Sequence, residues 1–176
     1  MKFCAFLRGV NIGGSVLKMA DVCKVFTDAG MENVSSVLAT GNILFSSERH
    51  HSELKVILEK AMSEYFNYEA FLFIKAENEV NEIFKNVPFQ TAENFHCYAF
   101  VGIDRIEEIL LDKFRKVEHF EEEKAEIVNG IFYWQIVKGK TLESNFGKIL
   151  GKKCLKDKLT SRNINTFEKI LKKMQL

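Results

Sequence analysis

The sequence is poor in residues that interrupt regular structure, with a single proline, Pro88, among 176 residues. It has four cysteines, and no two of them form a Cys-x-x-Cys pair. Their spacing indicates neither a disulfide framework nor a zinc site. No stretch approaches the roughly 20 apolar residues that a membrane helix needs. The formal net charge of +1 excludes a strong overall attraction to nucleic acid or to acidic surfaces.

The sequence is rich in residues that can form a hydrophobic core. Hydrophobic residues make up 47% of the chain and include 16 phenylalanines, a composition that excludes a disordered protein. The length fits one compact unit or two small ones packed together. Lys2 is followed by only five apolar residues before Arg8, which is too short for the core of a signal peptide. We therefore expect a soluble cytoplasmic protein with reduced thiols.

Charge is unevenly distributed along the chain. Residues 77–126 contain six Lys+Arg and 13 Asp+Glu, whereas residues 127–176 contain 11 and three. The acidic middle and the basic tail either neutralise each other or leave a basic face available to phosphates. Within the acidic part, Glu121–Glu123 is expected to be an exposed charged bend.

The first half of the chain predicts the order β-α-β-β-α-β, which is the ferredoxin-like arrangement. Apolar periodicity sets the elements. They are a strand over residues 2–7, a helix over 19–29 that ends at Gly30, a hairpin of 34–38 and 43–45, a helix from His50 with Tyr65 on its buried face, and a strand over 70–74.

The second half repeats this pattern after a helix over residues 77–85 and an irregular junction over 86–94. Asn129-Gly130 predicts a type I′ hairpin, and Asp104 with Glu107 predicts a capping box. The expected elements are strands over 95–102, 117–120, 125–128 and 131–137 and helices around 106–114, 146–150 and 167–174, the last capped by Asn165.

We therefore predict an α+β protein of two ferredoxin-like units in tandem, with an extra C-terminal helix. The N-terminal unit spans residues 1–78, a helix and junction span 79–94, and the second unit with its basic helical tail spans 95–176.

The segment Arg8-Gly9-Val10-Asn11-Ile12-Gly13-Gly14 is the first candidate site and is expected to be a strand-to-helix turn. Glycines let backbone N–H groups approach an anion, and a following helix start adds positive potential. Arg8 supplies a planar donor fork, and Lys18 a second charge. The alternative is a purely structural turn. The spacing matches neither of the common nucleotide-binding glycine loops.

Two further polar segments are candidates. Thr40-Gly41-Asn42 predicts a hairpin turn, and Thr160-Ser161-Arg162-Asn163 precedes the last helix, a position that favours anions. The structural alternatives are a simple turn at the former, and an arginine bound to carbonyls beside a capping asparagine at the latter.

Together the three segments resemble a bacterial domain-of-unknown-function family, number 1697. Its patterns are Leu-Arg-Gly-Ile-Asn-Val-Gly-Gly followed by Lys-Met, Ser-Gly-Asn-Val-x-Phe, and Thr-x-Arg-Asn-Trp-Asn-Thr. Ile164 departs from the last pattern, where the family commonly has tryptophan, and so alters any site that the ring lines. The resemblance implies a duplicated ferredoxin-like fold in a cytoplasmic bacterial protein, and no reaction.

We predict that the three segments converge on a composite site for a small anionic ligand. The expected ligand-binding residues are Arg8, Asn11, Gly13, Gly14, Lys18, Thr40, Asn42, Arg162 and Asn163. No general base is identifiable, so no enzymatic reaction, catalytic residue or cofactor is assigned. His96 and Cys97 are neighbours on a strand and point to opposite sides, so they make a poor nucleophile–base pair. The adjacent His50 and His51 do not share a helix face, so they are a poor metal pair, and no metal site is predicted.

Two other functions remain open. The basic tail and the strand residues Phe3, Phe6 and Phe45 favour a nucleic-acid-binding module, although we expect these rings to be core and no RNA-binding signature is present. Alternatively, the surface serves protein partners without a ligand. The oligomeric state is not encoded in a recognisable pattern.

Overall fold

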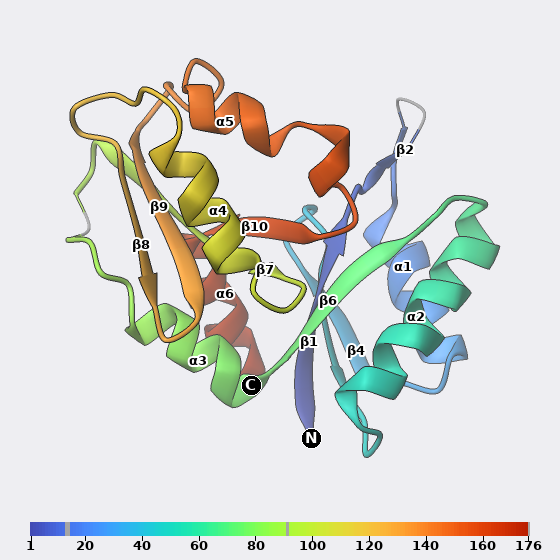
Figure 1. Cartoon of the computed structure of the whole chain (residues 1–176). Coiled ribbons are helices and arrows are strands. Elements are labelled where there is room, and N and C mark those ends of the chain that lie inside the picture. Colours follow the sequence, from blue (N-terminus) through green and yellow to red (C-terminus); the bar gives the residue numbers. More distant parts are fainter. Residues whose placement is uncertain (13–14, 91, 176) are drawn as a thin grey trace. The chain divides into compact units, whose positions relative to one another are not determined.

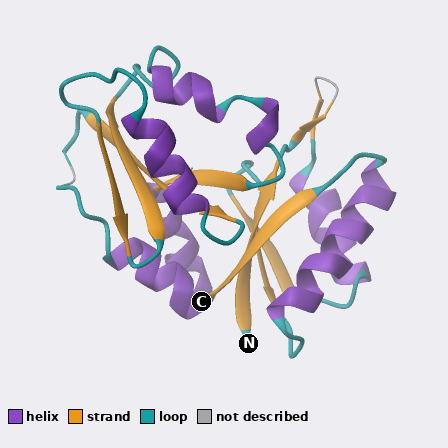
Figure 2. Cartoon of the chain, viewed as in Figure 1, coloured by secondary structure: helices purple, strands orange, loops and turns teal. Residues whose placement is uncertain are grey.

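The computed structural model describes residues 1–12, 15–90 and 92–175. In this part of the chain, helices are interspersed with strands, and the strands form two four-stranded antiparallel sheets and a two-stranded ribbon (Figures 1 and 2). The predicted mixed α+β class is confirmed. Contacts between residues divide the chain into unit 1, residues 1–81 and 169–176, and unit 2, residues 82–168.

Unit 1 is a sheet with two helices on one face. The strand order is β4-β5-β1-β6, and all neighbours are antiparallel. The elements are β1 (Lys2–Arg8), α1 (Met19–Asp28), β4 (Glu32–Val37), β5 (Asn42–Ser46), α2 (His51–Phe66) and β6 (Phe71–Ala76). Phe3, Ala5 and Leu7 of β1 join the core beneath α1 and α2, which lie side by side in Figure 1.

The helices of unit 1 follow the predicted apolar spacing. Val22, Val25 and Phe26 of α1 are buried, and Gly30 after the helix has a φ of +87°, a conformation that glycine adopts without strain. The prediction for Tyr65 was wrong, because its side chain is 52% exposed near the end of α2.

The outer edge of β6 is covered by side chains of α2. Glu59 Oε1 accepts a hydrogen bond of 3.0 Å from the Leu72 N–H, and Lys55 Nζ donates one of 2.8 Å to the Leu72 carbonyl. Ser63 Oγ accepts another from the Ala70 N–H. Unpaired backbone groups on an edge strand invite pairing with another chain, so these contacts protect that edge.

Unit 2 has a sheet of order β10-β7-β9-β8, again antiparallel throughout. Its elements are β7 (Phe95–Gly102), α4 (Ile106–Arg115), β8 (Lys124–Val128), β9 (Ile131–Val137), α5 (Asn145–Leu150), a short 3-10 helix (Lys153–Leu155) and β10 (Leu159–Asn163). Asn129 and Gly130 have φ values of +49° and +75°, as the predicted type I′ hairpin requires.

Three predictions for unit 2 were wrong. Residues 117–120 form no strand, and residues 159–163, where no strand was predicted, form β10. Only one residue of β10, Leu159, is strongly apolar, so periodicity gave no strand signal. The capping box is absent, because Arg105 occupies the cap of α4 in a left-handed conformation and its side chain accepts no hydrogen bond from the backbone of the helix.

Glu123 also differs from its expected role in an exposed bend, since it is 4% exposed. Its carboxylate accepts hydrogen bonds from Trp134 Nε1 at 2.9 Å, from Ser144 Oγ at 2.7 Å and from the Phe120 N–H at 3.2 Å. Three donors compensate a buried carboxylate for the water it loses. Glu121 and Glu122 are exposed, as expected.

The chain passes between the units within two helices, α3 (Glu77–Lys85) and α6 (Ile164–Met174). The end of α6 groups with unit 1, whereas the sequence predicted the tail as part of the second unit. Lys2 Nζ donates a hydrogen bond to the Met174 carbonyl, and Lys173 Nζ donates one of 2.9 Å to the Ser36 carbonyl. The Lys2 ammonium therefore binds a carbonyl of the last turn of α6, where carbonyls lack partners within the helix, and Lys173 links the end of α6 to β4.

Candidate functional site

Arg8 is the last residue of β1 and is half-buried. Because side chains alternate along a strand, Arg8 shares the face of Phe6, opposite the α1–α2 core that contains Leu7. In the part of the chain that the structure describes, its guanidinium has no hydrogen-bond or ion-pair partner. Burial lowers the pKa of Arg8 from its ordinary value, because removal from water disfavours the charged form of the guanidinium.

The segment after Arg8 does not lead directly into a helix, so the predicted strand-to-helix turn was wrong. Residues of β2 (Asn11–Ile12) pair with β3 (Ser15–Val16) in a small ribbon, and the Leu17 N–H closes it on the Val10 carbonyl at 2.8 Å. The helix α1 begins only at Met19. The positive potential that was expected from a helix start directly after this segment is therefore not available to an anion there.

The candidate residues of this segment are placed as follows. Asn11 lies on β2 and is exposed, and Lys18 is exposed at the position preceding α1. The candidates Gly13 and Gly14 lie outside the described residues.

The second segment packs directly on the first. The Leu7 N–H donates a hydrogen bond of 2.8 Å to the Gly41 carbonyl. Gly41 has a φ of +75°, and a Cβ added to it would lie 2.6 Å from Val10 Cγ1 and 2.9 Å from Leu7 Cβ. Glycine is therefore required here by both conformation and space. The structure brings these two of the three predicted segments together.

Asn42 shapes the turn between β4 and β5. It is 0% exposed, and its Nδ2 donates hydrogen bonds to the Val37 carbonyl at 2.9 Å and to Thr40 Oγ1 at 3.0 Å. Its Cα partner on β1 is Phe6, so Asn42 shares a sheet face with Arg8. Both amide hydrogens are used within the turn, which favours the structural role of this asparagine.

The third segment belongs to unit 2. Arg162 lies on β10, and its Nη1 donates hydrogen bonds to Thr160 Oγ1 at 2.7 Å and to the Ser161 carbonyl at 2.8 Å. Asn163 ends the strand, and its Oδ1 accepts from the Asn165 N–H at 3.0 Å. The cap of α6 is thus Asn163, and the prediction that Asn165 caps the last helix was wrong. These hydrogen bonds support the structural alternative for this segment, in which the arginine binds a carbonyl beside a capping asparagine.

A cavity of about 370 Å³ adjoins Asn163. Ile164 and Asn165 line it from α6, and Cys97 and Gln135 line it from the sheet. Sequence reasoning missed Gln135, which is only 7% exposed. The available signal was one glutamine within the otherwise apolar β9 sequence, IFYWQIV.

The aromatic residues that favoured nucleic-acid binding are buried, as the core interpretation predicted. Phe3, Phe6 and Phe45 are 3%, 0% and 2% exposed. Base stacking needs an accessible ring face, so these three side chains offer no stacking surface.

The histidines and cysteines form no catalytic or metal-binding set in the described ranges. His96 Nδ1 lies 3.0 Å from Asn163 Nδ2, whereas Cys97 points to the other sheet face, where it lines the cavity with Gln135. No group of three or more His, Cys, Asp or Glu side chains lies together there. Among these same residues, none of the helices has the length and apolar character of a membrane span.

Comparison with known proteins gives a family and a fold. A family model described as "Protein of unknown function (DUF1697)" matches residues 1–133. A solved structure described as a conserved bacterial protein, SP0830 from Streptococcus pneumoniae, aligns with a TM-score of 0.76 over 97% of each chain. At 21% sequence identity, this likeness shows the fold alone. No curated protein matches the sequence.

Proposed function

Because the chain belongs to the DUF1697 family, whose description carries no activity, we propose a function from the geometry: it binds a small anionic ligand, a carboxylate or a phosphate ester, at a composite site around Arg8. One observation carries the proposal. The guanidinium of Arg8 is half-buried and, among the described residues, has no carboxylate or carbonyl to compensate it. A partly dehydrated cation gains most from an anion that forms charge-assisted, bidentate hydrogen bonds.

The surroundings of Arg8 support this proposal. The Gly41 turn packs against Leu7 of β1 and against Val10, which follows the strand, and these contacts constrain the backbone on both sides of Arg8. A constrained binding group loses less conformational freedom when its ligand binds. Lys18 and Asn11 are exposed nearby in sequence and belong to the proposed set in unit 1, together with Gly13, Gly14 and Thr40. The buried Asn42 would support this set by holding the turn of Thr40 and Gly41. Contribution from Arg162 and Asn163 of unit 2 is the remaining part of the composite-site hypothesis.

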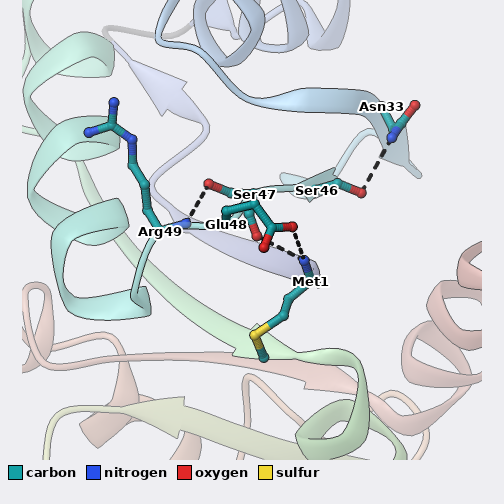
Figure 3. Close-up of polar contacts among 6 residues, drawn as sticks. All are labelled: Met1, Asn33, Ser46, Ser47, Glu48 and Arg49. Carbon is teal, nitrogen blue, oxygen red and sulfur yellow. Dashed lines mark hydrogen bonds and ion pairs between the residues drawn. The ribbon is translucent and has the colours of Figure 1, made fainter.

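A thermal-shift titration with inorganic phosphate, citrate and acetate tests the proposal at constant ionic strength. A ligand at about 100 times its Kd should raise Tm by roughly 5–10 °C. Arg8→Gln should abolish the shift. Arg49→Gln is the matched control, because it removes the same charge from unit 1. Figure 3 shows the Arg49 guanidinium directed away from the polar contacts that its backbone N–H makes with Ser47.

The outcomes separate the parts of the hypothesis. If no anion shifts Tm, or if Arg8→Gln keeps the shift, the anion site is wrong. If Arg162→Gln binds as tightly as the unaltered protein while Arg8→Gln does not, the site is confined to unit 1 and convergence of the three segments is wrong.

We also propose that the two units are a tandem duplication of the ferredoxin-like fold. The strand orders support this: if the four main strands of each unit are numbered along the chain, both sheets read second-third-first-fourth, the order of that fold.

We also propose a bacterial, cytoplasmic setting for the protein. It is supported by four cysteines that are all free thiols, as in a reducing compartment.

A nucleic-acid-binding function has one observation in its favour. Lys152, Lys153 and Lys156 are exposed around the 3-10 helix of unit 2. A gel-shift assay at low and moderate salt distinguishes it, because phosphate-driven binding weakens steeply with salt. Absence of both anion and nucleic-acid binding would leave a protein-interaction role.

A further inference from the structure

Gln135 is a buried side chain with unused hydrogen-bonding capacity. It lies in the middle of β9, is 7% exposed, and pairs across the sheet with Cys97. Its Nε2 makes one long hydrogen bond of 3.4 Å to the Gln90 carbonyl. Its Oε1 accepts no hydrogen bond from the described residues, and because no fully buried side-chain nitrogen or oxygen among them lacks a partner, this oxygen keeps accessible surface.

The carboxamide of Gln135 can therefore bind a further molecule. A carboxamide offers two N–H donors and an oxygen with two lone pairs, of which the described residues use one donor. A ligand that both donates and accepts hydrogen bonds along one edge would use the second N–H and the oxygen, whereas a simple anion, which only accepts, would leave the oxygen unused.

The space beside Gln135 is large enough for such a ligand. Two adjoining cavities of about 370 and 510 Å³ share Phe89, Gln90, Ala92, Phe95 and Gln135 in their linings. Cavities of several hundred cubic ångströms are typical of small-molecule sites. Phe89 and Phe95 are half-buried and supply aromatic surface against which a planar ring packs favourably.

The charges around the cavities disfavour an anionic ligand. Glu93, Glu121 and Glu122 line them, against Lys124 and Lys138. Cys97, also in the lining, stays a neutral thiol at physiological pH, because burial raises its pKa to about 12. The lining therefore differs in kind from the Arg8 site, which presents an arginine without a carboxylate partner.

We propose that unit 2 binds a neutral, planar nitrogen heterocycle of the nucleobase type in these cavities. The carboxamide of Gln135 pairs with the donor–acceptor edge of the base, and Phe89 and Phe95 contact its ring. The acidic rim selects a base or nucleoside over the corresponding nucleotide. This site is independent of the Arg8 site and does not rest on it.

Isothermal titration of the full chain with adenine, hypoxanthine, cytidine, uridine and nicotinamide tests the proposal. At least one base or nucleoside should bind saturably, and its 5′-monophosphate should bind more weakly. Gln135→Leu should weaken binding at least tenfold, since 1.4 kcal/mol corresponds to a factor of ten. The matched control is Gln175→Leu, the same substitution at an exposed position of unit 1, which should leave binding unchanged.

A second measurement keeps the test decisive if Gln135→Leu fails to fold. In the unaltered protein, the side-chain NH₂ resonances of Gln135 should shift on titration with the base, while those of Gln175 should stay in place. No binding by any base or nucleoside at millimolar concentration, binding by nicotinamide alone, or unchanged Gln135 resonances at saturation would each overturn the proposal. Loss of binding in Arg8→Gln with retention in Gln135→Leu would also overturn it.

Discussion

The indole Nε1 of Trp134 donates a hydrogen bond of 2.9 Å to the carboxylate of Glu123, which is 4% exposed. The same oxygen accepts from Ser144 Oγ, the cap of α5, whose Oγ in turn accepts from the Gly147 N–H. The buried carboxylate of Glu123 therefore links the start of α5 to Trp134 of β9 by hydrogen bonds.

Replacement of Glu123 by Gln should destabilise the protein by about 1–3 kcal/mol, because the new NH₂ group faces a donor and leaves buried groups unpaired. Urea unfolding followed by fluorescence of the single tryptophan measures the change. Glu122→Gln, at an exposed position, should change stability by less than about 0.5 kcal/mol. Equal stability of the two variants would show that the buried contacts are not stabilising.

Gly41 should tolerate alanine less well than Gly130, although both have a φ of +75°. The left-handed conformation costs an L-residue roughly 1–2 kcal/mol at either position. At Gly41 the added methyl also meets Val10 and Leu7, whereas nothing lies within 4 Å at Gly130, and overpacking adds about 1–3 kcal/mol. Parallel denaturant curves of Gly41→Ala and Gly130→Ala would contradict this prediction if their midpoints coincide.

Glu59→Ala should expose the edge of β6. The Leu72 N–H loses its acceptor, and we expect a loss of about 1–2 kcal/mol together with faster hydrogen exchange at Leu72. Glu64→Ala is the control on the same helix. Glu64 is exposed, and the ion pair of its Oε1 with Lys60 Nζ is long, at 3.9 Å. Light scattering during mild heating should rise earlier for Glu59→Ala, as an unprotected edge promotes association.

Stability should fall as the pH rises above 9. The Cys97 thiol has an ordinary pKa of 9.0 when unfolded and a pKa of about 12 in the folded chain. Its contribution is therefore complete below pH 9 and is lost between pH 9 and 12, where only the unfolded state releases the proton. Burial also raises the pKa of Tyr133, which adds to the fall at higher pH.

Urea midpoints at pH 8 and pH 10.5 measure this loss. Cys97→Ala should show a smaller loss than the unaltered protein, and Cys154→Ala, at an exposed thiol, should show the same loss as the unaltered protein. An equal pH dependence in all three proteins would mean that ionisation of Cys97 does not contribute.

The sequence predicted those elements whose side chains carry a strong local signal. Val22, Val25 and Phe26 show a helical stripe, and Asn129-Gly130 shows a turn, so α1 and the β8–β9 hairpin were found. The strand β10 was missed because Arg162 and Asn163 are polar, and its pairing with β7 is a contact between residues about 60 positions apart in sequence. Local patterns carry no information about such pairing.

The candidate site was predictable in part, because some of its residues also carry a strong local signal. The glycines and polar residues near Arg8 and Gly41 indicated special backbone geometry, and the structure joins these two segments at Leu7. No sequence pattern indicated that both amide hydrogens of Asn42 are donated within its own turn. The burial of Glu123 and Gln135 was equally hidden, because it depends on what covers each residue after folding.

The path of the chain through α6 affects how the protein forms during its synthesis. All of unit 2 lies between residues 82 and 168, whereas unit 1 also includes residues 169–176, with the contacts of Lys173 and Met174 to Ser36 and Lys2. Because residues 169–176 are synthesised after the whole of unit 2, unit 1 acquires its full set of contacts only once the sequence of unit 2 has been made.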